Sequence, residues 1–121
     1  MGSSTTTGFT RIATVVLALA VPGAAAIAQS GDSIELGKQV AFDRDKGNCL
    51  ACHAIADGKL PGNIAPPLVG MKQRFPDRVA LRAQIADASV RNPRTTMPPF
   101  GNNRILTDSE IDAIVDFLYT L

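Results

Sequence analysis

The sequence predicts an all-α domain whose helices are joined by long loops. Apolar residues recur at helical spacing in the segments 33–42, 77–89 and 107–118, and no segment alternates apolar and polar residues as a half-buried strand does. Proline and glycine gather in the segments 57–67 and 94–103, which marks both as loops. The 121 residues correspond to a single domain.

The first two helices have recognisable ends. A charged turn over residues 43–48 follows the first helix. Pro76 stands at the entry of the second, and Asn92-Pro93 ends it, because proline restricts the residue before it to extended backbone. The expected apolar faces are Ile34 or Leu36 with Val40 and Ala41 in the first helix, and Leu81, Ile85 and Ala88 in the second.

The third helix has the clearest start. Thr107 and Glu110 stand at the spacing of a capping box, in which Thr107 caps the helix and Glu110 reaches back to the backbone N–H of Thr107. The apolar face behind this cap consists of Ile111, Ile114, Val115 and Leu118.

The N-terminal segment resembles an export signal rather than part of the domain. Arg11 precedes a short apolar run, and Ala26-Ile27-Ala28 forms a small-x-small cleavage site. A membrane anchor is the alternative, but the apolar run 12–21 is shorter than the roughly 20 residues that a spanning helix needs. We therefore expect residues 1–28 to be a cleaved signal peptide and residues 29–121 to be a periplasmic domain without a membrane span.

The motif Cys49-Leu50-Ala51-Cys52-His53 is the C-x-x-C-H pattern of c-type haem attachment. Residues three apart on a helical turn face the same side, so both thiols can reach the two vinyl groups of one haem and form thioethers. The next residue then places its imidazole under the iron. The only two cysteines and the only histidine of the chain lie in this motif, which predicts one covalent haem with His53 as an iron ligand.

Three other interpretations of the motif are weaker. A thioredoxin-like dithiol needs a βαβ context, which the pattern lacks. A zinc site needs four ligands, whereas the motif offers two Cys and one His. A plain disulfide in an exported domain is the third alternative.

The second axial ligand cannot be another histidine, which leaves Met71, Met97, a lysine or water. Met97 lies in a proline-bracketed loop and is free of helical constraints, whereas Met71 directly follows residues 66–70, which we expect to wrap the His53 side of the haem. Isolated methionines are usually core residues, which is the alternative for either one. A thioether ligand raises the reduction potential and suits electron transfer. We expect Met97 to be the ligand, and a backbone carbonyl near Pro66 to accept the other ring N–H of His53.

The balanced charge does not indicate nucleic acid or another general polyanion as a partner, because 12 basic residues, one of them Arg11, stand against 11 acidic residues. Basic residues nevertheless dominate between Met71 and Arg104. Two interpretations of this basic stretch remain open: a solvated face, or a docking face for an acidic partner and charge near haem propionates. The stretch contains Lys72, Arg74, Arg78, Arg82, Arg91, Arg94 and Arg104 against Asp77 and Asp87.

The chain resembles class I cytochromes c from Gly37 to its end. The resemblance rests on the following residues: Gly37 and Phe42 in the first helix, Cys49 to His53, Ala65-Pro66-Pro67-Leu68, Met97-Pro98, and the final helix. It implies that the carbonyl of Pro66 accepts the His53 N–H, that Leu68 packs on the haem, and that the first and last helices cross near Gly37. Residues 43–48 lengthen the usual gap before the motif, so the helix contact there is expected to differ.

More narrowly, the segments 47–53, 60–71, 91–93 and 97–101 resemble the SoxX-type cytochrome, the small haem subunit of the SoxAX complex in bacterial thiosulfate oxidation. The resemblance implies a periplasmic heterodimer with a large SoxA-type subunit that performs the sulfur chemistry, together with a sulfur-carrier protein and a downstream electron acceptor. This chain would then be an electron-transfer subunit and not itself an enzyme. A free soluble carrier cytochrome of a respiratory chain is the alternative, and an enzyme or gas sensor with an open iron site is a third hypothesis, against which Met97 argues.

Overall fold

The computed structural model describes residues 1–3 and 23–121, and in that part of the chain all regular structure is helical. The expected all-α class is therefore confirmed. The elements, in chain order, are α1 (Gly23–Phe42), η1 (Cys49–Ala51), α2 (Met71–Arg74), α3 (Arg78–Ala86), η2 (Ala88–Val90) and α4 (Asp108–Leu118). The predicted signal peptide falls mainly on residues 4–22, outside the described residues. Among the described helices, none has both the length and the apolarity needed to cross a bilayer.

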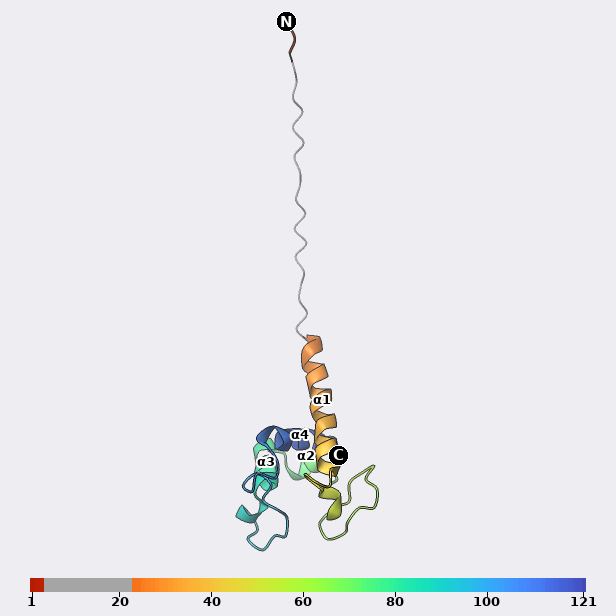
Figure 1. The fold of residues 1–121 in the computed structure, drawn as a ribbon, viewed down its shortest axis with the longest axis vertical. Helices are drawn as coiled ribbons and strands as arrows, with labels where there is room; N and C mark the ends of the chain where they lie inside the picture. Colours follow the sequence, from red (N-terminus) through yellow and green to blue (C-terminus); the bar gives the residue numbers. More distant parts are fainter. Residues whose placement is uncertain (4–22) are drawn as a thin grey trace.

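The molecule is organised around the crossing of α1 and α4, with α3 packed against α4 (Figure 1). At the crossing, an added Cβ on Gly37 would lie 1.9 Å from the backbone oxygen of Ala113, so only glycine allows this approach. Phe42 meets Phe117 edge-on, with ring centroids 5.9 Å apart. The expected crossing at Gly37 is confirmed.

The lengthened turn 43–48 does not loosen the first helix. The N–H of Gly47 donates to the carbonyl of Val40, and that of Asn48 donates to the carbonyl of Asp43, so the turn folds back on the end of α1. Lys46 forms an ion pair with Glu110 and thereby joins the turn to the start of α4. The additional residues are thus accommodated in a compact turn, and the aromatic contact of α1 with α4 persists.

Helix boundaries differ from the expectation in two places. Helix α1 begins at Gly23, ahead of the expected Ser33, and runs through the predicted cleavage site at Ala28. The expected helix 77–89 is wrong in its last three residues. Helix α3 ends at Ala86, because Asp87 adopts an extended backbone and its carboxylate accepts from the N–H of Ser89 within η2. The capping box at Thr107 and Glu110 is present as predicted.

Two loops extend from the helices on the same side of the molecule (Figure 1). We call residues 49–68 the cysteine loop and residues 91–106 the methionine loop. Helix α2, which the sequence did not predict, follows the cysteine loop as a single turn that starts after Gly70 in the left-handed conformation. Its first N–H donates to the carbonyl of Leu121, which ties α2 to the segment that follows α4.

Candidate haem-binding site

The motif begins on η1, directly after Asn48 in the left-handed region. The backbone N–H groups of Cys52 and His53 both donate to the carbonyl of Cys49, so the turn holds the two cysteines and the histidine in one tight unit. Both cysteines are free thiols, which does not favour a plain disulfide. Burial raises the pKa of the Cys49 thiol to about 11, and a neutral thiol is unlike the reactive thiolate of a dithiol redox site.

The rest of the cysteine loop folds back along the motif. The N–H groups of Gly62, Ala65 and Leu68 donate to the carbonyls of Leu50, Cys52 and Ala54 in that order. Gly62 is needed for this close approach, because an added Cβ would lie 2.2 Å from the carbonyl oxygen of Ala51. These bonds place Pro66 next to the imidazole of His53.

The His53 ring is held in a defined orientation. Its Nδ1 lies 2.6 Å from the carbonyl oxygen of Pro66, as the resemblance implied. A carbonyl can only accept, so Nδ1 carries the proton and Nε2 keeps its lone pair for a metal. Proteins fix the orientation of a metal-binding histidine by such a hydrogen bond from its other ring nitrogen.

The methionine loop approaches from the side of α3. The N–H of Gly101 donates to the carbonyl of Ala86, and those of Ile105 and Leu106 donate to the carbonyl of Phe100, so the loop is fastened at Phe100. Closer to its tip, the N–H of Met97 donates to the hydroxyl of Thr95 at 3.1 Å. Met97 is half-buried and packs against the hydrophobic core.

Two adjoining cavities of about 410 and 390 Å³ separate the loops, each within the range typical of cofactor sites. All six residues predicted to bind the cofactor line them. Cys49, His53, Pro66 and Met97 line both cavities, Leu68 lines the first and Cys52 the second. Met71, the rejected ligand candidate, also lines the first cavity. No motif indicated that the following residues also line the first cavity: Phe75, Gln84, Asn92, Phe100, Leu106, Ile114 and Leu118.

The lining suits a large apolar ring with a metal at its centre. The two cysteines, His53 and Met97 line this space, and the first cavity is otherwise bounded mainly by aliphatic and aromatic residues, whereas the second has a mixed polar and apolar lining. In the described part of the chain, no three His, Cys, Asp or Glu side chains converge as ligands for a bare metal ion, which disfavours the zinc alternative. The residues therefore fit haem better than zinc.

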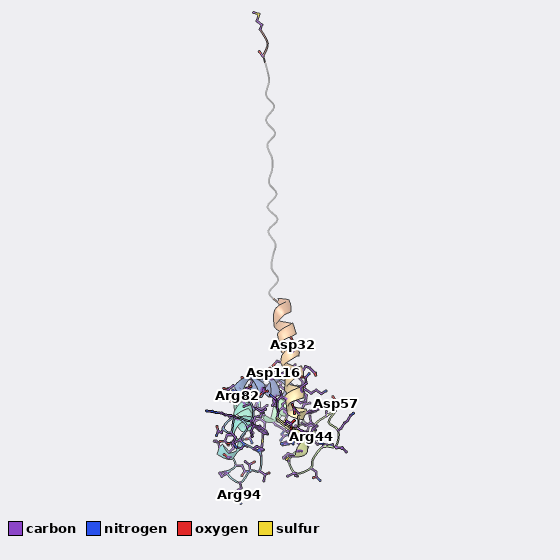
Figure 2. All side chains as sticks on the ribbon, viewed as in Figure 1. Asp32, Arg44, Asp57, Arg82, Arg94 and Asp116 are labelled. Atoms are coloured by element: carbon purple, nitrogen blue, oxygen red, sulfur yellow. The ribbon has the colours of Figure 1, made fainter. Side chains whose placement is uncertain are left out.

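The basic stretch divides into two groups. Arg78 pairs with Asp116 at 2.6 Å, and Arg82 pairs with Asp108 and Asp112 at 2.7 Å, so these two arginines link α3 to α4. By contrast, Arg74, Arg91 and Arg94 line the cavities, whose described lining contains no acidic residue. Figure 2 shows Arg94 at the tip of the methionine loop, well away from Arg82 and Asp116. A cationic lining of this kind favours a ligand with carboxylates, such as the propionates of haem.

One comparison with known proteins identifies a family. The model of the family described as cytochrome C oxidase, cbb3-type, subunit III matches residues 38–118. The matched range begins within α1, contains both loops and both cavities, and ends at the last residue of α4. Comparison with individual curated proteins gives no match.

Proposed function

The chain belongs to this family of c-type cytochrome domains, and we propose that Cys49 and Cys52 attach one haem whose iron is held by His53 and Met97. It is an electron-transfer haem protein, and members of the family bind haem covalently. The observation that supports the ligand set is the convergence of all six predicted residues on the adjoining cavities. A single haem follows from the single C-x-x-C-H motif.

When bound, haem supplies a one-electron couple. The chain's own residues bind and orient it. The thioethers from Cys49 and Cys52 retain the ring, and the Pro66 carbonyl fixes the tautomer and orientation of the His53 imidazole. Leu68 and Phe100 are buried beside the cavity and exclude water from the ring, which with a Met97 thioether favours a raised reduction potential.

The finer proposal is that this chain is the small cytochrome subunit of a SoxAX-type complex in thiosulfate oxidation, exported to the periplasm. The likeness of segments 47–53, 60–71, 91–93 and 97–101 to the SoxX-type cytochrome supports it. Sulfur chemistry on a protein needs a nucleophilic thiolate or an open metal. Both cysteines are used for attachment here and no third exists, so that chemistry belongs to a large SoxA-type partner.

The second candidate is a free carrier cytochrome that delivers electrons to a respiratory chain or terminal oxidase. The description of the matching family, which names an oxidase subunit, favours it. The two candidates differ in their partners: the first predicts a stable heterodimer, the second transient complexes only.

The experiment has two stages. The exported wild-type protein is denatured and extracted with acid–acetone, and we expect the haem to remain on the chain, whereas Cys49→Ala with Cys52→Ala retains none. Extractable haem in the wild type contradicts the attachment. The protein is then isolated from native periplasm and assayed for thiosulfate-dependent haem reduction, alone and with the copurified partner and sulfur-carrier protein. Reduction only in the complete mixture supports the SoxAX assignment, and a monomer that thiosulfate fails to reduce in any mixture supports the free carrier.

A further inference from the structure

Arg74 makes two contacts that no motif predicted. It is the last residue of α2, and one guanidinium nitrogen donates to the carbonyl oxygen of Pro67 at 2.8 Å. The same nitrogen lies 3.4 Å from the sulfur of Met71. Arg74 also lines the first cavity, so it belongs to the wall of the proposed haem site.

The carbonyl that Arg74 binds is adjacent to the one that binds His53. The Pro66 oxygen accepts from Nδ1 of His53 at 2.6 Å, and the Pro67 oxygen accepts from Arg74. Consecutive carbonyls belong to neighbouring, rigid peptide planes, and both proline φ angles are restricted. With φ of Pro67 restricted, ψ of Pro67 is the one soft rotation between the two carbonyls, so a displacement of the Pro67 carbonyl beyond that rotation also moves the acceptor of the His53 N–H.

The segment needs such support from a side chain. Pro66 and Pro67 have no N–H to donate, and both are exposed. The backbone bonds that fasten the loop lie on either side, at Ala65 and Leu68. Helix α2 is itself anchored, because the N–H of Met71 donates to the carbonyl of Leu121 at 3.3 Å. The guanidinium of Arg74 thus connects the proline pair to a fixed point of the helical scaffold.

We propose that Arg74 is a positioning residue for His53: by binding the Pro67 carbonyl, it holds the neighbouring Pro66 carbonyl against the imidazole and so fixes the axial histidine. The inference rests on the proposed function, since it concerns His53 as the iron ligand. The guanidinium also lies 3.4 Å from the Met71 sulfur, which gives that thioether a partner within α2 and favours Met97 over Met71 as the iron ligand.

The test compares Arg74→Met with Arg91→Met in the complete haem-loaded protein. Both variants remove one positive charge from the same cavity. Arg91, however, contacts the ring of Phe75, with its guanidinium carbon 5.4 Å from the ring centroid. The readout is the solvent exchange rate of the His53 Nδ1 proton, measured by NMR in the reduced protein. A hydrogen bond that loses its support opens more often, so we expect about tenfold faster exchange in Arg74→Met and less than about twofold change in Arg91→Met.

Arg74→Lys is the conservative variant, because an ammonium group can still donate to the Pro67 carbonyl. We expect it to restore most of the protection of the His53 proton. Equal exchange rates in Arg74→Met and Arg91→Met, or a lysine variant no better protected than the methionine variant, overturn the inference. If Arg74→Met does not fold with haem, Arg74→Leu and Arg91→Leu, which likewise have no donor, are compared by the same criterion. Loss of covalent haem in the wild type instead overturns the proposed function, so the two failures are distinct.

Discussion

Ile111 and Val115, at the crossing of α1 and α4, are fully buried, whereas Leu60 and Ile64 of the cysteine loop are 92% and 73% exposed. The helices bury their apolar side chains against each other. The two loops are instead fastened by backbone hydrogen bonds and face a cavity. The difference indicates that the helical scaffold is stabilised by its own packing, while the loops depend on what fills the space between them.

Removal of the haem is the strongest way to test this dependence. Without haem, the apolar residues that line the first cavity of about 410 Å³ lose the packing partner that would shield them from water. We expect Cys49→Ala with Cys52→Ala, freed of haem, to lose cooperative unfolding in denaturant, with amide protection lost first at Gly62, Ala65 and Leu68. If the haem-free variant keeps a cooperative transition close to that of the haem-loaded protein, the loops do not depend on the haem for their structure.

The next largest effect is expected at the helix crossing. Gly37→Ala places a methyl group against the backbone of Ala113, so α1 and α4 must separate, at a cost of about 3 kcal/mol or more. Gly31→Ala is the control on the same helix, since an added Cβ there meets nothing within 4 Å. We expect it to be neutral or slightly stabilising. Denaturant unfolding of the haem-loaded variants measures both values, and equal stabilities would mean that the crossing tolerates displacement.

A smaller effect is expected at the start of α4. Thr107→Ala removes the oxygen that accepts from the N–H of Glu110 and should cost about 1 kcal/mol. Thr107→Ser keeps a hydroxyl in place and should cost much less. Chemical denaturation of the two variants separates them, and an equal loss would assign the effect to the threonine methyl group rather than to the cap.

The smallest effect is expected from the ion pair between Lys46 and Glu110. The hydrogen bond from Lys46 lowers the pKa of Glu110 and raises that of Lys46. The lowered Glu110 pKa contributes stability above the normal value of 4.5, and this stability is lost as the pH falls through the folded-state pKa. The advantage of the wild type over Glu110→Gln should therefore be present at pH 7, shrink in acid below pH 4.5, and weaken in high salt, because the pair is at the surface. A stability difference between the wild type and Glu110→Gln that stays constant with pH would mean that packing, not the ion pair, causes it.

Local signals accounted for much of the structure. The capping box predicted the start of α4, and C-x-x-C-H with the following prolines predicted the residues that meet around the cavities. The end of α3 was mispredicted because Asp87 uses its carboxylate to cap η2 rather than continue the helix. A single turn such as α2 has no periodicity to detect. The contacts of Arg74 depend on where α2 lies in three dimensions, so the sequence alone could not reveal them. The roles of the six cavity residues as haem contacts remain predictions.

The contact at Gly37 also limits which second mutations could repair it. The atom that an added Cβ would strike is the main-chain oxygen of Ala113, which every amino acid possesses. No exchange of the side chain at position 113 can create room there. A genetic search for suppressors of Gly37→Ala should therefore recover reversion or changes that shift all of α4, and no compensating partner at Ala113.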